Sequence, residues 1–254
     1  IFFLMLCMIL VSCTGQKTGK ENDNNDKIAI EVGEIKFPPQ DVLQLKSYYL
    51  SSSVHVDSID YLIGYNYRLH SLDCMNLKSK SVTQIVLPGD GPDAIVRLSG
   101  IYAQSLDSVW ISDESERAFL IDSVGTIKRM IDLKKYLEDQ EQLLINTNYA
   151  MFTSHLFYNA SRHSLMFLVK HTPSNTFIVK EVFIDEVGKM ATYQLSSSKV
   201  VPDMSKGYAY INFPNVNFVG ENIVYNYPVE SSIYMLDIRT NERKYILADS
   251  HYTS

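Results

Sequence analysis

Residues 82–133 read VTQIVLPGDGPDAIVRLSGIYAQSLDSVWISDESERAFLIDSVGTIKRMIDL, and this stretch decides the fold. Four of its segments are rich in β-branched or aromatic residues or alternate apolar with polar ones: 100–103, 109–112, 118–121 and 126–131. They are separated by short polar segments at 107–108, 113–116 and 122–125. The first kind of segment fits a half-buried pleated surface, and the second kind favours turns. The stretch therefore predicts four strands joined by tight turns, which form an antiparallel meander.

The same design occurs three more times along the chain. The second strand of each repeat is marked by a turn residue followed by three apolar residues, beginning at Asp60, Ser108, Ser164 and Asn222. The hairpin of each repeat is marked by an Asp that follows an apolar residue, at Asp73, Asp122, Asp185 and Asp237. The spacing of roughly 50 residues lies within the range of propeller blades. The alternative is a chance alignment of short apolar runs.

We therefore expect an all-β fold, a β-propeller of four-stranded antiparallel blades. About four blades are present, within residues 47–87, 82–133, 151–195 and 208–247. The chain stops at Ser254 without a further strand to close a ring, so we expect part of a ring of six or seven blades that is incomplete at the C-terminus.

The first residues predict where the protein is located in the cell. Residues 1–12 (IFFLMLCMILVS) are apolar and uncharged and lack an initial Met, so they are typical of the h-region of a signal peptide whose start is missing. Leu10, Val11, Ser12 and Cys13 match the lipobox of bacterial lipoproteins, in which the Cys thiol is lipidated and becomes the mature N-terminus. The alternative is a clipped transmembrane helix with an incidental Cys. With a lipobox, the mature protein is anchored to a membrane and does not cross it.

Residues 13–27 follow as the lipidated Cys and a polar tether, and the propeller domain is expected over 28–254, beginning with a strand at 28–32. The Asn/Asp run in the tether lacks the acidic spacing, the Gly and the distal Glu of a calcium-binding EF-hand loop. A solvated linker is the preferred interpretation, because the segment has too few apolar residues to fold.

In one segment the spacing of apolar residues changes from that of a strand to that of a helix. Residues 132–145 (DLKKYLEDQEQLLI) carry Leu133, Tyr136, Leu137 and Leu144 near helical spacing, with Asp132 placed to cap. They predict a short amphipathic helix, which serves either to dock a partner or to cover the end of a sheet.

Neither a metal nor a cofactor is predicted. His155, His163 and His171 are evenly spaced, but turn residues between them prevent all three from sharing a strand, and zinc favours closer ligand pairs. The loop at 88–93 lacks the Lys and Ser/Thr of a phosphate-binding P-loop and is interpreted as a connector between blades.

Composition restricts the partners. A formal net charge of −6 argues against nucleic acid and anionic lipid, which require basic patches. Of the three cysteines, Cys7 would be cleaved off and Cys13 lipidated, so that Cys74 has no disulfide partner and is expected to be buried. The 17 Tyr residues favour an all-β domain with aromatic surfaces.

No catalytic residue is predicted, because the chain has no GxSxG, HExxH, CxxC or dinucleotide Gly motif. Two function classes remain: a membrane-anchored binding or scaffold module for a protein, peptide or glycan, and a hydrolase or lyase of envelope glycans or peptides. Acids with raised pKa at one end of the channel would favour the enzyme. A wide apolar or aromatic patch there would favour the binding module.

The lipobox, the GDGPD loop at 89–93 and the run LDSVWISDESERAFLIDSVGTIK at 106–128 resemble the uncharacterised six-bladed, TolB-like β-propeller lipoproteins of Bacteroidota. The resemblance extends diffusely over residues 28–250. It implies a lipoprotein of the bacterial envelope, anchored to the outer membrane on its periplasmic or surface face. It implies no activity, because that family offers no catalytic residues to transfer. The chain departs from the family in having about four repeats, from which we expect truncation at both ends.

Overall fold

The computed structural model describes residues 34–38, 45, 47–144, 156–199 and 213–247. The chain divides into two units, Ile1–Ile35 and Lys36–Ser254, and the fold described below belongs to the second. The predicted signal peptide, lipobox and tether, and the strand predicted at 28–32, lie outside the described residues. No helix in the described part of the chain is long and apolar enough to cross a bilayer.

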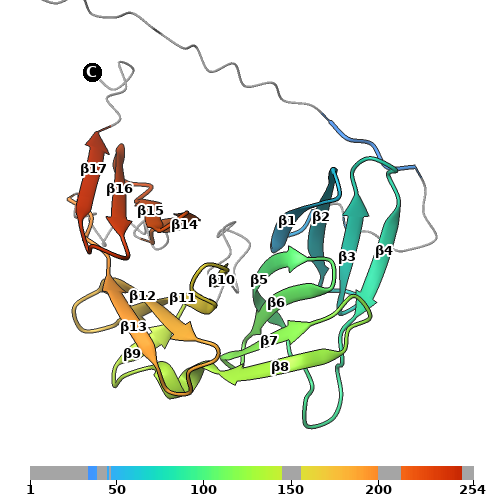
Figure 1. Cartoon of the computed structure of the whole chain (residues 1–254), viewed down its shortest axis with the longest axis horizontal. Helices are drawn as coiled ribbons and strands as arrows, with labels where there is room; N and C mark the ends of the chain where they lie inside the picture. The colour runs from blue at the N-terminus through green and yellow to red at the C-terminus, as the bar shows by residue number, and fades with distance from the viewer. Residues whose placement is uncertain (1–33, 39–44, 46, 145–155, 200–212, 248–254) are drawn as a thin grey trace, which may run out of the picture. The chain divides into compact units, whose positions relative to one another are not determined.

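The second unit consists of four antiparallel sheets, here called blades 1 to 4, which follow one another along the chain (Figure 1). Blade 1 contains β1 (Ser51–Val56), β2 (Ile59–Asn66), β3 (Ser71–Asn76) and β4 (Val82–Val86). Blade 2 contains β5 (Leu98–Ser105), β6 (Ser108–Asp113), β7 (Arg117–Ile121) and β8 (Ile127–Asp132). Blade 3 contains β9 (Glu141–Leu143), β10 (Leu156–Asn159), β11 (Ser164–His171), β12 (Thr176–Phe183) and β13 (Met190–Gln194). Blade 4 contains β14 (Asn215–Val219), β15 (Asn222–Asn226), β16 (Ser232–Asp237) and β17 (Arg243–Leu247).

The strands predicted from the repeat are confirmed. β2, β6, β11 and β15 contain the four predicted second strands, and β5 is longer at both ends than the predicted 100–103. The alternation that predicted them has its expected cause, since Ile223 and Tyr225 in β15 are buried between partly exposed neighbours.

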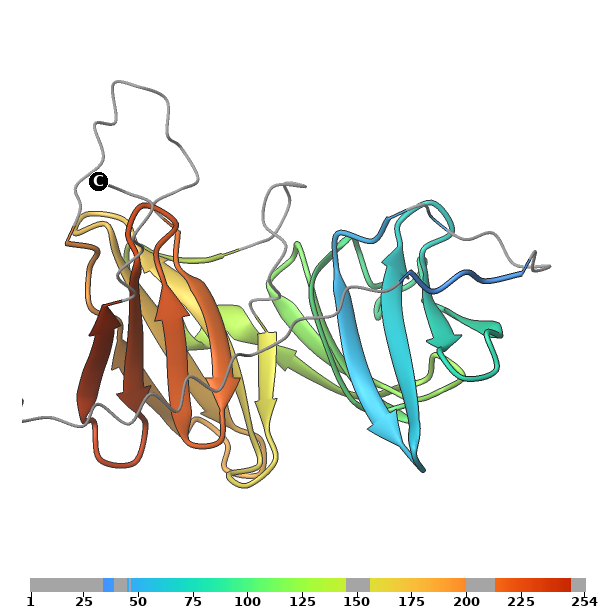
Figure 2. The ribbon, with the colours of Figure 1, turned by 90° about the horizontal axis from the view of Figure 1, so that it is seen from above.

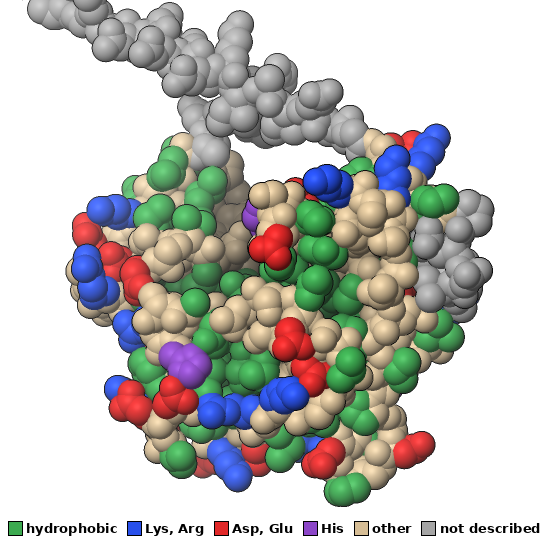
Figure 3. Space-filling model, turned by 45° about the vertical axis from the view of Figure 1, so that its right-hand side comes forward, with side chains coloured by type: hydrophobic (Ala, Val, Ile, Leu, Met, Phe, Trp, Pro, Cys, Tyr) green, Lys and Arg blue, Asp and Glu red, His purple; other side chains and the backbone are tan. Residues whose placement is uncertain are grey.

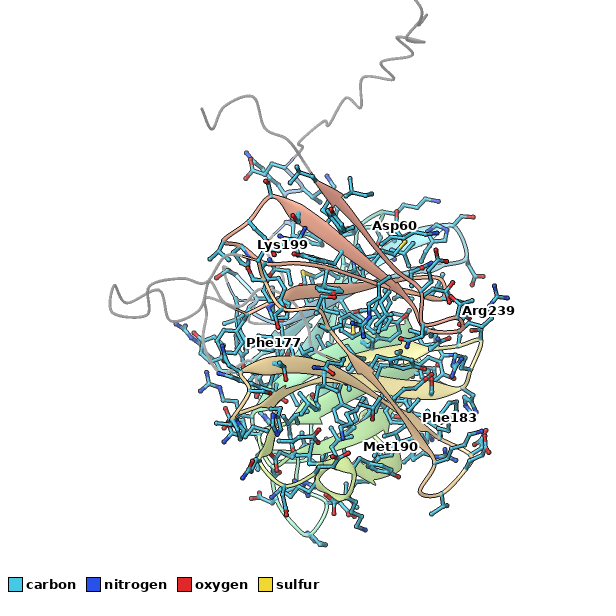
Figure 4. The ribbon with its side chains drawn as sticks, turned by 90° about the vertical axis from the view of Figure 1, so that its left-hand side faces the viewer. Asp60, Phe177, Phe183, Met190, Lys199 and Arg239 are labelled. Carbon is cyan, nitrogen blue, oxygen red and sulfur yellow. The ribbon has the colours of Figure 1, made fainter. Side chains whose placement is uncertain are left out.

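Each blade has two ends. The lower end, at the lower side of Figure 2, carries the turns between first and second strands and between third and fourth strands, such as the β1–β2 and β16–β17 turns. In Figure 4, Arg239 in the β16–β17 turn lies toward the same side as Phe183 and Met190 beside the β12–β13 turn. Phe177, at the opposite end of β12, and Lys199 lie toward the other side of that view. The lower end therefore collects two sets of short turns.

Hydrophobic clusters join successive blades. Three clusters join blades 1 and 2, blades 2 and 3, and blades 3 and 4, with representative pairs Ile63 and Phe119, Trp110 and Phe167, and Val179 and Tyr225. The first strands of neighbouring blades approach one another, β1 beside β5 and β5 beside β10. Successive four-stranded sheets that pack face to face with their first strands together form a β-propeller, so the predicted fold is confirmed.

Blade 4 has one face without such a cluster. None of the core clusters of described residues joins blade 4 to blade 1. Cross-strand pairing places Asn226, Ile233 and Ile246 on the face opposite Tyr225, and these two isoleucines are 40% and 60% exposed. A groove of about 560 Å³ lies over this face, and Phe157 of blade 3 is among its lining residues.

The helix predicted at 132–145 is wrong except at its start. Asp132 caps as expected, because its side chain accepts a hydrogen bond from the N–H of Lys134, but the helix is one 3-10 turn, η1 (Leu133–Tyr136). The rest of the segment enters β9, where Leu143 pairs with Val169. Pairing with the edge of β11 outweighs the weak helical preference of so short a segment.

β9 and β10 together form one first strand. Phe167, Leu168 and Val169 are consecutive in β11, and they pair with Leu156, the N–H of Leu144, and Leu143. The two segments therefore pair with one continuous edge of β11, Leu143 opposite Val169 and Leu156 opposite Phe167.

Asp73 is not a hairpin residue, which corrects one of the four predicted hairpin positions. It lies inside β3, and Asn76 takes the turn position, where its Oδ1 accepts hydrogen bonds from the N–H groups of Lys78 and Ser79. Asp237 accepts in the same way from Arg239 and Thr240. Asn and Asp make equivalent turns, and that equivalence concealed the correct position in blade 1.

Candidate functional site

The surface does not by itself mark a site. On the face shown in Figure 3, hydrophobic side chains gather over the middle, and basic and acidic side chains alternate around them. Apolar atoms cover much of any folded protein, so this pattern alone indicates little. Cavities between the blades are more informative, because ligand sites are concave and lined mainly by apolar groups.

One cavity lies among the first strands of blades 2, 3 and 4, and we call it the channel pocket. It has a volume of about 330 Å³. It is lined by Tyr102, Phe157, Tyr158, Asn159, Ala160, Ser161, Met166, Phe218, Gly220 and Glu221. β5 contributes Tyr102, β10 contributes Phe157 and Tyr158, and β14 contributes Phe218, so three blades are needed to build it.

The aromatic rings of the channel pocket form two inclined pairs. The ring centroids of Phe157 and Phe218 are 4.5 Å apart with an angle of 54° between the planes. Tyr102 and Tyr158 are 6.5 Å apart at 52°. Phe157 and Tyr158 are neighbours in β10 and point to opposite faces of the blade, which is why each meets a ring from a different neighbouring blade.

The polar groups of the pocket come from two turns at the lower end. Ser161 Oγ donates a hydrogen bond to Glu221 Oε1 at 2.7 Å and lies 2.8 Å from Asn159 Oδ1, which joins the turns of blades 3 and 4. Gly220 precedes Glu221 with φ of +59°, a conformation that glycine adopts without strain.

The turn that holds Ser161 is itself fixed. Arg162 Nε donates to Glu181 Oε1 at 2.8 Å, and Glu181 is fully buried. Glu181 also accepts from Ser164 Oγ and from the hydroxyl of Tyr193 at 2.7 Å. Burial, reinforced by that hydrogen bond, raises the pKa of Tyr193. A buried carboxylate with three donors holds the polar wall of the pocket in one position.

A second cavity of about 370 Å³, here called the interblade pocket, lies between blades 2 and 3. Its walls include Trp110 and Tyr158, which stack at 6.2 Å with an interplanar angle of 20°. His163 lies beside it, with Nδ1 bonded to Asp185 Oδ2, and Arg129 Nη1 lies 3.5 Å from Asp185 Oδ1. Tyr158 lines both pockets.

Hydrogen bonds lower the pKa of three aspartates in turns. Each described aspartate whose pKa clearly departs from its ordinary value has it lowered, and these are Asp107, Asp122 and Asp237. Hydrogen bonds to the ionised form are the main cause: from Ser123 to Asp107, from Lys128 to Asp122, and from the N–H of Thr240 to Asp237. These acids stabilise turns.

The predicted site residues have different outcomes. Cys13, the predicted lipidation site, and His155 lie outside the described residues. Cys74 is buried as predicted, and burial raises the pKa of its thiol to about 11. His163 lines the interblade pocket and lies just before the start of β11, whereas His171 is the last residue of that strand. The structure therefore separates the two side chains by the length of β11. Among the described residues there is no group of His, Cys, Asp or Glu that could hold a metal ion.

Sequence reasoning missed the residues of the channel pocket. A signal for them existed, because Tyr102, Phe157, Tyr158 and Phe218 all lie in first strands shortly before the turn to the second strand. An aromatic residue in a strand is so ordinary that this recurrence was informative only when the first strands were known to meet.

The comparisons with known proteins concern the fold. No family model and no curated protein matches the sequence. Among solved structures, the chain is similar to a DUF4221 family member from Bacteroides vulgatus, with a TM-score of 0.60, 12% identity, and coverage of 86% of this chain and 62% of that one. Weaker similarity is found to apo AztD from Citrobacter koseri, with a TM-score of 0.44 and 13% identity over 79% of this chain and 47% of that one. BamB from Moraxella catarrhalis is similar with a TM-score of 0.40 and 9% identity over 76% of this chain and 50% of that one. The chain thus spans less than two thirds of the DUF4221 structure, and that similarity shows a β-propeller fold.

Proposed function

We propose that this propeller is a binding module and that the channel pocket receives its ligand. The observation that carries the proposal is the convergence of Tyr102, Phe157, Tyr158 and Phe218 from three blades on one cavity. Aromatic walls with few polar groups are typical of binding sites. The ligand is a component of the bacterial envelope, free or part of a protein, peptide or glycan.

The test is capture of partners from the native envelope. The complete protein is mildly crosslinked in the envelope and isolated, and the proteins captured with it are identified by mass spectrometry. The variants Phe218→Ala and Val219→Ala are treated in the same way. Val219 is the matched control, since it is 60% exposed and does not line the pocket. We expect a partner that Phe218→Ala loses and Val219→Ala keeps. The same partners with all three proteins would contradict a role for the pocket.

We further propose that the module is a lipoprotein of the outer membrane, on its periplasmic or surface face, held by a lipid on Cys13. The support is the lipobox at 10–13 followed at once by a polar segment. In cells fed a labelled fatty acid, we expect Cys13→Ala to abolish incorporation of the label and Cys74→Ala to leave it unchanged. Equal labelling of Cys13→Ala and wild type would refute the anchor.

We also propose that the complete ring has six blades of the TolB type. Support comes from the uncovered face of blade 4 and from the greater length of the DUF4221 structure. If a neighbouring blade covers Ile233 in the full-length protein, Ile233→Asp costs about 3 kcal/mol of unfolding free energy, as for a buried isoleucine. If the face stays open, the change costs less than about 0.5 kcal/mol.

One observation favours a second candidate function, a hydrolase or lyase of envelope glycans or peptides. The His163–Asp185 pair beside the interblade pocket resembles the pair used in general base catalysis, where a carboxylate orients the imidazole. Turnover of such substrates that His163→Gln abolishes and His171→Gln preserves would establish this alternative.

A further inference from the structure

We propose that the channel pocket selects a small ligand with an alkylammonium group. This inference rests on the proposed binding function and specifies its ligand by charge and size. The volume of about 330 Å³ is near the lower limit for small-molecule pockets, so it suits a small cation with a short polar tail.

The charge of the pocket favours a cation. Glu221 is the only ionisable carboxyl among its described lining residues, and no Lys, Arg or His lines it. Glu221 Oε1 accepts from Ser161, while Oε2 receives no hydrogen bond from any residue that the structure describes. Arg162 interacts electrostatically with Glu221, but its Nε is already bonded to Glu181 at 2.8 Å. The carboxylate of Glu221 therefore retains capacity for a cationic ligand.

The rings of the pocket favour the same ligand. The faces of aromatic rings carry negative potential and attract ammonium groups, and cages of several rings bind alkylated ammonium. Phe157 and Phe218 are inclined at 54°, and Tyr102 and Tyr158 at 52°. Because the two rings of each pair are inclined, the four rings do not form one flat platform, and such a lining suits a compact, rounded cation. A pyranose ring would instead need one broad flat platform to stack on.

One buried lining residue of the pocket suits methyl groups. Met166 lines it and is fully buried, so it contributes a polarisable, apolar surface. An anionic ligand is disfavoured, since it would meet the carboxylate of Glu221 and no Lys, Arg or His is among the described lining residues. The chemistry of the described lining therefore points to an alkylammonium ligand.

The protein contains its own reporter for binding. Trp110 is the one tryptophan of the chain, it is 1% exposed, and it stacks on Tyr158, which lines the pocket. A ligand that displaces or polarises Tyr158 changes the fluorescence of Trp110. Binding can therefore be followed by fluorescence and by calorimetry with an unlabelled protein.

The experiment titrates choline into the full-length protein, solubilised in an uncharged polyoxyethylene detergent. Three solutes are compared with it: 3,3-dimethylbutan-1-ol, which is the neutral isostere of choline; sodium chloride at equal ionic strength; and a neutral disaccharide. We expect choline to bind saturably with a Kd of about 1 mM or tighter. The neutral isostere should bind at least about tenfold more weakly, because it lacks the attraction to Glu221 and to the rings.

Two carboxylate variants make the test specific. Glu221→Gln should weaken choline binding about tenfold. The matched control is Glu242→Gln on the same blade, an exposed acid paired with Lys244 at 3.3 Å outside the pocket, and it should bind as wild type does. Far-UV circular dichroism of both variants verifies that each is folded.

Each other outcome overturns the inference. Equal binding of the neutral isostere, or unchanged binding by Glu221→Gln, would exclude ammonium recognition. Binding of the disaccharide alone would overturn the ligand class and leave the proposed binding function standing. No saturable binding of choline would also overturn the inference, while the capture experiment with Phe218→Ala decides separately whether the pocket binds an envelope partner.

Discussion

Lys180 Nζ lies 2.8 Å from Glu141 Oε2, and the two side chains are 0% and 3% exposed. Glu141 is the first residue of β9, and Lys180 is in the third full strand of the same blade. Glu138, which is 68% exposed, lies 3.3 Å from the same ammonium. β9 is short and pairs with β11 at three positions only. The buried ion pair therefore adds an anchor that holds β9 in place.

We predict that Glu141→Gln destabilises the protein by about 3 kcal/mol, because it leaves the Lys180 charge buried with one exposed partner. Replacing both residues, as Lys180→Met with Glu141→Leu, should cost much less, since no uncompensated charge remains. Urea unfolding followed by Trp110 fluorescence measures both. As a control, Glu186→Gln breaks the exposed Glu186–Lys189 pair and should change stability by less than about 0.5 kcal/mol. A double variant as unstable as the single one would refute this role for the pair.

Asp73 should be essential for blade 1. Its fully buried carboxylate accepts hydrogen bonds from Tyr48 Oη at 2.5 Å, Asn66 Nδ2 at 3.0 Å and Gln84 Nε2 at 2.6 Å. Asp73→Ala deprives these donors, of which Asn66 is fully buried, of their acceptor, and we expect a loss of roughly 3 kcal/mol in unfolding free energy. Asp60→Ala, at an exposed position on the same blade, should cost less than about 0.5 kcal/mol. Similar stability of the two variants would show that the network contributes little.

Asp122 predicts a dependence of stability on acid pH. The hydrogen bond from Lys128 lowers the pKa of Asp122 to about 2, from about 3.9 in an unfolded chain. Because the folded pKa is the lower one, the contribution of Asp122 is complete above about pH 4 and is lost as the pH falls toward 2. The Tm difference between wild type and Asp122→Asn should therefore be constant near neutrality and should shrink as the pH falls from about 4 to about 2.

A second variant distinguishes Asp122 from the general effect of acid. Lys128→Met removes the ion pair, whose Nζ–Oδ2 distance is 2.7 Å, and should move the window to higher pH. A Tm difference that stays the same down to pH 2 would contradict the assignment.

Gly100 is predicted to tolerate no side chain. A Cβ there would lie 2.6 Å from Ser112 Oγ and 2.8 Å from Leu156 Cβ, at the junction of blades 2 and 3. Gly100→Ala should destabilise by about 1–3 kcal/mol through overpacking. Gly188→Ala separates packing from backbone strain, since Gly188 has φ of +79° and open space around it. Thermal unfolding measures the stability of both variants. A larger loss of stability in Gly188→Ala than in Gly100→Ala would argue against tight packing at this junction.

The strands and most turns could be predicted from the sequence because their causes are local. The alternation around Ile223 and Tyr225 reflects one buried and one exposed face, and Asp122 and Asp237 make turns by bonding nearby N–H groups. The propeller fold followed from the repetition of these patterns, and the burial of Cys74 from its lack of a disulfide partner. The lipid on Cys13 stays a prediction, since that residue lies outside the described part of the chain.

The tertiary structure decided what depends on partners distant in sequence. Leu143 lies in a strand because the edge of β11 was free to pair with it, which no local helical spacing could reveal. Asp73 differs from its supposed counterparts because Tyr48 and Gln84 meet it inside the fold. The channel pocket depends on Tyr102, Phe157 and Phe218 meeting from three blades. Sequence alone determined the local period and turn chemistry, whereas the packing of whole blades determined which side chains share a cavity, because such contacts form only when the sheets assemble.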